Sequence, residues 1–243
     1  MQKIINLFIL VLLSNMANAQ IKEVKYKDDS QSLTGMVAKS ESARKGVLIL
    51  PAWQGIDDEA KQAALNLQQQ GYIAFIADIY GDGNKPKDNA EAKARSSYYK
   101  ENYKNYQQRI KVALEELVKQ GADFNHLAVI GYCFGGTGAL ETARAQLPVN
   151  AVVSIHGGLS KGNRPNGPIS AKVLVLHGAE DQSVPETDVE ALRNELKQAK
   201  TDWQMIYYAN SKHTFTDPAS PDYNETMSRR SWQHLLLFLE DVL

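Results

Sequence analysis

Residues 127–137, LAVIGYCFGGT, decide how this chain folds. The apolar, β-branched run at 127–130 predicts a buried strand, and a helical pattern begins at about Thr137. The short turn between them carries Cys133. A strand, a tight turn with a nucleophilic side chain at its apex, and a helix form the elbow typical of one large group of α/β folds.

Two glycines flank Cys133 for a steric reason. A side chain at the apex of such a turn forces residues two positions away into close contact, so Gly131 and Gly135 are expected there because they lack a Cβ. The following helix directs the positive end of its dipole at the sulfur, which favours a thiolate. A buried structural cysteine in a glycine-rich turn is the alternative interpretation.

On both sides of this stretch, apolar runs alternate with segments at helical spacing. This rhythm predicts an α/β fold with a mostly parallel central sheet and helices on both faces. We expect strands near residues 22–26, 32–38, 47–50, 73–77, 127–130, 151–155, 173–176 and 204–208. The last five are nearly all apolar, as central strands buried on both faces should be. Helices are expected at 57–70, 97–120, 137–145, 186–199 and 226–243, with Gly71 and Gly121 ending two of them.

The chain of 243 residues suits one large domain. The segments 81–89 and 157–170 are rich in Gly, Pro and Asn, and we interpret them as surface loops because strand patterns continue on both sides. Residues 20–243 are therefore expected to form a single domain.

Residues 1–19 resemble a secretory signal peptide. Lys3 precedes an apolar run of about ten residues, and Ala17-Asn18-Ala19 offers the small residues that signal peptidase cleaves after. The apolar run is shorter than the roughly twenty residues needed to span a bilayer. We expect an exported protein, periplasmic or secreted, with no membrane insertion after cleavage; a retained anchor is the alternative.

Composition excludes several classes of function. The 27 basic and 28 acidic residues nearly cancel and no basic block stands out, so nucleic acid is not an expected partner. One cysteine provides neither an intramolecular disulfide nor a multi-cysteine zinc site. The five histidines are scattered without a metal-binding spacing, so no metal is expected.

An acid and a base follow Cys133 in the order that the elbow fold requires. Asp181 follows the strand expected at 173–176, and His213 follows the strand expected at 204–208. The base needs an imidazole within reach of the sulfur, and a carboxylate must hold its tautomer. Asp181 could instead be a simple helix cap.

Five motifs in this order resemble those of the dienelactone hydrolase family of α/β-hydrolases. They are GYCFGG at 131–136, ADIYGDG at 77–83, SIHGGL at 154–159, HGAED at 177–181 and KHTF at 212–215. The resemblance covers the chain from about Lys45 to its end. It implies a catalytic Cys133-His213-Asp181 triad, hydrolysis of small esters or lactones, and no cofactor.

One position departs from that family. The family commonly carries a glutamate that interacts with the nucleophilic cysteine, and the matching position here is Ala52. The backbone N–H groups of Trp53 and Phe134 are still expected to form the oxyanion hole, since backbone donors do not depend on the side chain. Trp53 and Tyr80 are candidates for substrate contact.

The remaining aromatic and imidazole side chains favour structural interpretations. His156 and His177 follow central strands and are expected to be structural histidines, although they could line the site. The tyrosines of residues 98–106 recur at roughly helical spacing, which favours packing over a pocket rim.

Three hypotheses about function follow. The first is an exported cysteine hydrolase of small esters or lactones, working through an acyl-thioester as a monomer or small homo-oligomer. The second is a binding protein that keeps the fold and has lost turnover along with the glutamate missing at Ala52. The third is a thiol sensor using Cys133, which the lack of a second cysteine disfavours.

Overall fold

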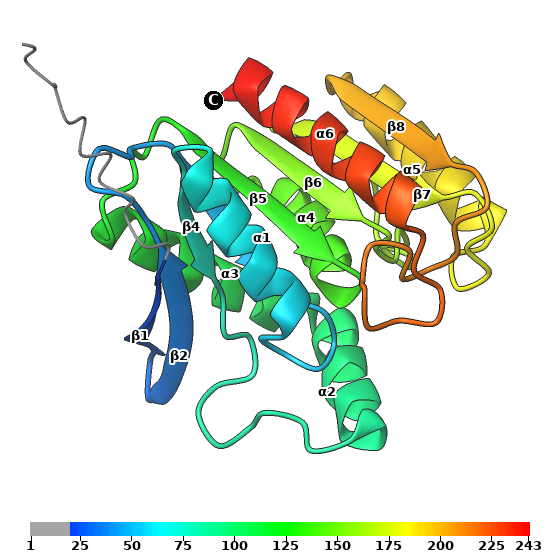
Figure 1. Ribbon diagram of the computed structural model, residues 1–243. Helices are drawn as coiled ribbons and strands as arrows, with labels where there is room; N and C mark the ends of the chain where they lie inside the picture. The colour runs from blue at the N-terminus through cyan, green and yellow to red at the C-terminus, as the bar shows by residue number, and fades with distance from the viewer. Residues whose placement is uncertain (1–19) are drawn as a thin grey trace, which may run out of the picture.

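The computed structural model describes residues 20–243, so the segment interpreted as a signal peptide lies outside the described residues. The centre of the described chain is one eight-stranded sheet with the order β1-β2-β4-β3-β5-β6-β7-β8. The strands are β1 (Ile21–Asp28), β2 (Gln31–Ala38), β3 (Gly46–Leu50), β4 (Ile73–Ile76), β5 (Leu127–Tyr132), β6 (Ala151–Ile155), β7 (Lys172–Gly178) and β8 (Trp203–Tyr208). β2 pairs antiparallel with β1 and β4, and all other pairs are parallel. The carboxyl ends of β3 to β8 therefore meet at one edge of the sheet (Figure 1).

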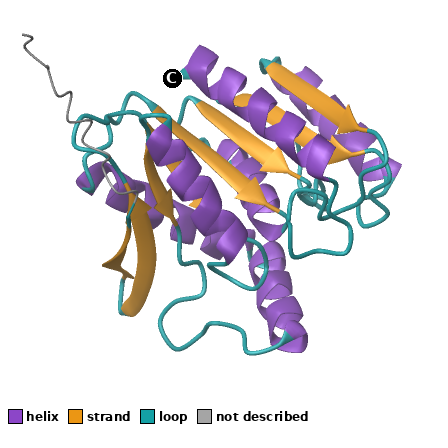
Figure 2. Ribbon diagram, viewed as in Figure 1, coloured by secondary structure: helices purple, strands orange, loops and turns teal. Residues whose placement is uncertain are grey.

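Within residues 20–243, six helices cover the two faces of the sheet, as the arrangement in Figure 2 shows. They are α1 (Asp58–Gln69), α2 (Asn89–Glu101), α3 (Tyr103–Lys119), α4 (Phe134–Arg144), α5 (Glu186–Ala199) and α6 (Glu225–Val242). α1 and α6 pack into one apolar core on the near side of the sheet in Figure 1, and α2 to α5 contribute to the second core behind it. None of the helices within residues 20–243 is long and apolar enough to cross a membrane.

The central strands read as apolar runs because both of their faces are covered. In β3 every residue is buried, with Val47 and Ile49 in the α1/α6 core and Leu48 and Leu50 in the opposite core. Alternate side chains of a strand point to opposite faces, so burial on both sides removes the usual polar alternation. The expectation of an α/β fold with a mostly parallel sheet is confirmed.

The prediction of a single helix at residues 97–120 is wrong. Two helices occupy this region, because Asn102 leaves the helical conformation with φ −98° and ψ 55°. α2 also begins earlier, at Asn89, where the Asp88 side chain accepts a hydrogen bond from the Glu91 N–H and caps the helix.

Two other features differ from expectation. The sequence predicts β8 among the central strands, but within residues 20–243 it pairs only with β7 and lies at the edge of the sheet, so side chains such as Tyr207 are exposed. α4 begins at Phe134 rather than at about Thr137, directly after the cysteine. The start of this helix therefore lies next to the sulfur.

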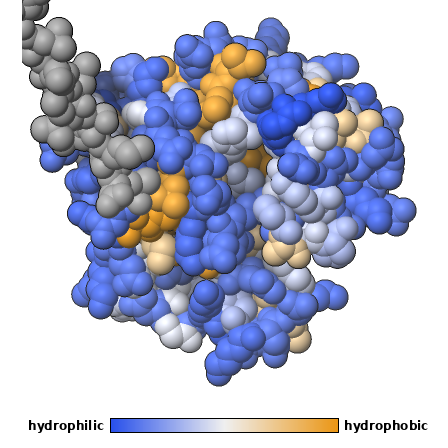
Figure 3. All heavy atoms as spheres, in the orientation of Figure 1, coloured by the Kyte–Doolittle hydropathy of each residue, from blue (hydrophilic) through white to orange (hydrophobic). Residues whose placement is uncertain are grey.

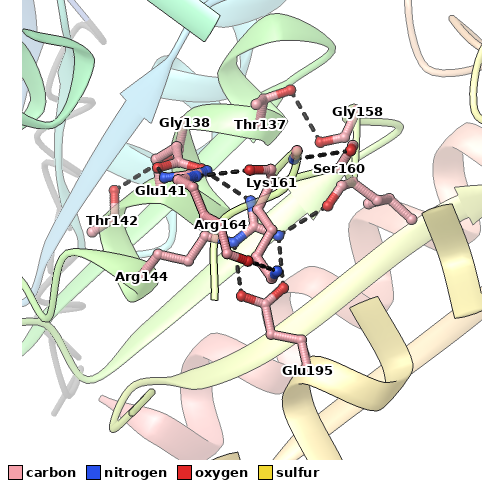
Figure 4. A network of polar contacts seen from close by, with 12 residues as sticks. Thr137, Gly138, Glu141, Thr142, Arg144, Gly158, Ser160, Lys161, Arg164 and Glu195 are labelled. Atoms are coloured by element: carbon pink, nitrogen blue, oxygen red, sulfur yellow. Dashed lines mark hydrogen bonds and ion pairs between the residues drawn. The ribbon is translucent and has the colours of Figure 1, made fainter. Parts of the chain in front are cut away.

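A network of buried ion pairs holds α4 in place (Figure 4). Glu141 of α4 accepts hydrogen bonds from both Arg144 and Arg164, and Arg144 also forms a bidentate pair with Glu195 of α5. Arg164 belongs to the loop at 157–170 and also stacks 3.9 Å over the Tyr103 ring. The network joins the helix after the elbow to three other parts of the chain.

Candidate active site

Cys133 stands on a strained turn between β5 and α4. Its φ of 51° and ψ of −110° are unusual for a residue with a side chain. A Cβ on Gly131 would collide with the carbonyl of Gly135, and a Cβ on Gly135 would collide with the carbonyl of Leu50 at the end of β3. Both glycines are thus required by the close approach of backbone to backbone.

The structure brings the three residues of the expected triad together. The Nε2 atom of His213 lies 3.2 Å from the Sγ of Cys133, and its Nδ1 lies 2.8 Å from the Oδ2 of Asp181. The second oxygen of Asp181 accepts a hydrogen bond of 2.8 Å from the Ser183 N–H. With its carboxylate fixed at both oxygens, Asp181 holds the imidazole with Nε2 facing the sulfur.

The charges along the row of contacts from Cys133 through His213 to Asp181 favour an ion pair. Burial alone would lower the pKa of His213, but its hydrogen bonds with Asp181 and Cys133 outweigh burial and raise the pKa to about 10. Burial of Asp181 is likewise outweighed by its hydrogen bond with His213, so the pKa of this carboxyl is lowered. An imidazolium beside the sulfur stabilises a thiolate there.

Two backbone N–H groups after the carboxyl ends of β3 and β5 have no hydrogen-bond partner among the described residues. Neither the Trp53 N–H nor the Phe134 N–H donates a hydrogen bond to any residue within 20–243. Phe134 is the first residue of α4, and the contact of Gly135 with Leu50 brings this helix start against the segment that leads from β3 to Trp53. This arrangement suits an oxyanion hole, the role predicted for the two N–H groups.

The residues around Trp53 differ in how deeply they are buried. Trp53 and Ala52 are partly exposed at the carboxyl end of β3. Tyr80 is only 4% exposed, and its hydroxyl donates a hydrogen bond of 2.7 Å to the carbonyl of Trp53. Tyr80 therefore lies beneath Trp53, and its contact with substrate stays a prediction.

His156 lies closer to the site than the sequence indicated. Its ring packs edge-on against His213 with 5.5 Å between centroids, and its Nε2 lies 2.7 Å from the hydroxyl of Thr216. Thr216 in turn donates a hydrogen bond of 2.6 Å to Glu59 of α1. Burial lowers the pKa of His156 to about 3, so this ring is neutral and does not compete with His213 for the proton.

Sequence reasoning also missed Arg95 of α2. Its Nε is buried and has no hydrogen-bond partner among the described residues. Burial raises the pKa of Tyr80, and the positive charge of Arg95 lowers it by a smaller amount. The only signal for this residue is a basic side chain on an otherwise buried helix face, which does not distinguish it from a solvated arginine.

A separate cavity of about 570 Å³ opens on the α1/α6 face, where the surface in Figure 3 is hollowed between the two helices. Glu59, Thr216 and Tyr132 line it, and none of the three triad residues does. Within residues 20–243 no group of His, Cys, Asp and Glu side chains is arranged to hold a metal ion.

The profile of the dienelactone hydrolase family matches residues 33–243. The chain belongs to this family. Its eight-stranded, mostly parallel sheet is that of a dienelactone hydrolase-like α/β-hydrolase, and the protein is a carboxylic ester hydrolase.

Several known proteins are similar to most of this chain. A dienelactone hydrolase-like promiscuous phosphotriesterase from metagenomic libraries is 33% identical, with a TM-score of 0.86 over 92% of this chain and 98% of that one. A Salmonella typhimurium protein named "Putative carboxymethylenebutenolidase" is 24% identical over 86% of this chain and 82% of its own. A Bradyrhizobium protein named "Probable 2-oxo-3-(5-oxofuran-2-ylidene)propanoate lactonase" is 22% identical over 79% and 82%.

Proposed function

We propose that this dienelactone hydrolase-like protein hydrolyses small esters or lactones, with Cys133 as nucleophile, His213 as acid and base, and Asp181 as the group that orients His213. The observation that carries this proposal is the row of contacts from Sγ through the imidazole to the carboxylate, at 3.2 Å and 2.8 Å. The raised pKa of His213 keeps its imidazole protonated, and this imidazolium lies 3.2 Å from the attacking sulfur.

In the first half of the reaction the Cys133 thiolate attacks the carbonyl carbon. The negative charge that develops on the carbonyl oxygen is accepted by the N–H groups of Trp53 and Phe134. The tetrahedral intermediate collapses as His213 gives its Nε2 proton to the leaving alkoxide. The products of this half are an alcohol and an acyl-thioester on Cys133; with a lactone, the alcohol remains attached to the acyl group.

In the second half the neutral His213 takes a proton from water, and the resulting hydroxide attacks the thioester carbonyl. The same two N–H groups accept the charge. Collapse releases the carboxylic acid and restores the Cys133 thiolate beside the imidazolium. No redox or metal step is needed for the atoms and charges to balance.

The choice of substrate class rests on the relatives. Two of them carry names that denote lactone hydrolysis, and both span most of this chain. The metagenomic relative named a promiscuous phosphotriesterase favours a second candidate activity, the cleavage of phosphotriesters by the same nucleophile. Partly exposed Trp53 is the aromatic side chain best placed to contact either substrate.

The test is turnover of a panel of nitrophenyl esters, lactones and a nitrophenyl phosphotriester. Cys133→Ala should lower kcat/KM for every hydrolysed substrate by at least ~10³-fold, because loss of a triad member costs several orders of magnitude. Thr142→Val is the matched control, since this buried hydroxyl lies on α4, the helix that follows Cys133, and within residues 20–243 it bonds only to the carbonyl of Gly138. Activity of Cys133→Ala within tenfold of the wild type would overturn the proposal.

We also propose that residues 1–19 direct export. The basic start, the short apolar run and the Ala17-Asn18-Ala19 segment support this. In a bacterial host that secretes it, the extracytoplasmic protein should begin at Gln20. Recovery of the full chain in the cytoplasm alone would contradict export.

A further inference from the structure

Two tyrosine hydroxyls bind the backbone of the two residues assigned to the oxyanion hole. The Tyr80 hydroxyl donates to the carbonyl of Trp53 at 2.7 Å, and the Tyr106 hydroxyl donates to the carbonyl of Phe134 at 3.1 Å. Tyr80 follows β4 and Tyr106 belongs to α3, so the two donors come from different parts of the fold. Each oxyanion residue thus has its own side-chain donor.

The two tyrosine rings also fix the side chain of Phe134. The rings of Tyr106 and Phe134 are nearly parallel, 5° apart in plane and 4.5 Å apart in centroid. The Tyr80 ring is 13° from the plane of Phe134 at 6.0 Å. Tyr99 packs obliquely against all three rings. Phe134 is therefore held by its ring and by its carbonyl at once.

Gly138 of α4 leaves room for the Tyr106 hydroxyl because it has no side chain. A Cβ on Gly138, one turn after Phe134, would collide with this hydroxyl. Tyr106 is fully buried, and burial raises the pKa of both tyrosines well above the usual value, so the hydroxyls remain proton donors throughout the working pH range. The hydrogen bonds to the two carbonyls therefore persist when substrate binds and when the pH changes within this range.

From these contacts we propose that Tyr80 and Tyr106 are positioning residues that hold the Trp53 and Phe134 N–H groups in the geometry of the oxyanion hole. This inference rests on the proposed function. Each hydroxyl fixes the peptide plane that follows its oxyanion residue, which restricts rotation of that residue and so the direction of its N–H. A donor helps a transition state only when it is already aimed at the developing charge.

The experiment compares two reactions of Cys133 in the Tyr80→Phe and Tyr106→Phe variants. Ester or lactone hydrolysis passes through an oxyanion, whereas alkylation by iodoacetamide is a displacement at the sulfur that creates none. Each variant should lower kcat by about tenfold with little change in KM, less than the ~10²–10³-fold effect of removing an oxyanion donor outright. The rate of alkylation and its pH dependence should stay within twofold of the wild type.

Tyr99→Phe is the matched control. Its hydroxyl, in the same aromatic cluster, accepts a hydrogen bond from Arg109 and touches neither oxyanion carbonyl, so its kcat should match the wild type. Melting temperatures show that the variants are folded. A role in packing alone would disturb Cys133 itself, and then hydrolysis and alkylation would fall together.

The outcomes separate this inference from the proposed function. If the wild type hydrolyses the substrate and both variants have the same kcat as the wild type, the positioning role is overturned, whereas the proposed triad is not. Equal losses of hydrolysis and alkylation also overturn it. If the wild type shows no hydrolysis that depends on Cys133, the proposed function fails and the positioning role fails with it.

Discussion

The Nε2 atom of His213 lies 3.2 Å from the Sγ of Cys133, although the two residues are 80 positions apart in the sequence. The contact forms because both residues leave the carboxyl ends of parallel strands, β5 and β8, at the same edge of the sheet. The same edge receives Asp181 after β7. The reactivity of the sulfur therefore depends on the position of one loop relative to another.

His213→Ala should slow the reaction of Cys133 with iodoacetamide. The raised pKa of His213, about 10, keeps an imidazolium 3.2 Å from the sulfur at neutral pH. This positive charge stabilises negative charge on the sulfur, so at about pH 7.5 the wild type should be alkylated several-fold faster than His213→Ala. Equal rates of alkylation would contradict this role of the imidazolium.

Asp181→Asn should lower kcat by at least ~100-fold while affecting KM little, because an amide cannot hold the His213 tautomer or stabilise its charge. The loss should be smaller than that of His213→Ala, since the base itself remains. Glu180→Gln is the matched control, because this neighbouring carboxylate is exposed. A harmless Asp181→Asn would point to Glu180 or Asp217 as the acid.

Glu59→Gln should stabilise the protein at neutral and alkaline pH but not near pH 4.5. Burial raises the pKa of Glu59 from 4.5 to about 8 in the folded state. The folded chain holds this proton between those values while the unfolded chain releases it, so stability falls as the pH rises from about 4.5 to 8. Glutamine resembles the protonated acid and removes this loss. The melting temperature should exceed that of the wild type at pH 8.5 and match it at pH 4.5, with exposed Glu101→Gln as the control.

Glu141→Gln should destabilise the fold through the network of Figure 4. The Glu141 side chain is 3% exposed and pairs with Arg144 and Arg164. Removing one buried partner costs ~3–5 kcal/mol, and we expect the lower end because Arg144 keeps its pair with Glu195. Urea unfolding measures the loss. The exposed Glu115 pairs with Lys111 at 4.0 Å, so Glu115→Gln should cost less than ~1 kcal/mol.

The sequence by itself determined the fold class and the three residues of the candidate site. The apolar runs before Cys133 and Asp181 are visible because parallel strands covered on both faces lose their polar alternation. The carboxyl ends of such strands share one edge, so the order of the chain already grouped Cys133, Asp181 and His213. The glycines around Cys133 are equally local, since their contacts lie within one turn and one neighbouring strand.

Only the tertiary structure decided which distant side chains support that site. Tyr106 lies 28 residues before Phe134, and Glu59 lies 157 residues before Thr216, so their hydrogen bonds depend on how helices dock on the sheet. The edge position of β8 and the break at Asn102 are also set by neighbours rather than by local pattern. A periodic pattern records which face of an element is buried, but the partner on that face follows from strand order and helix packing.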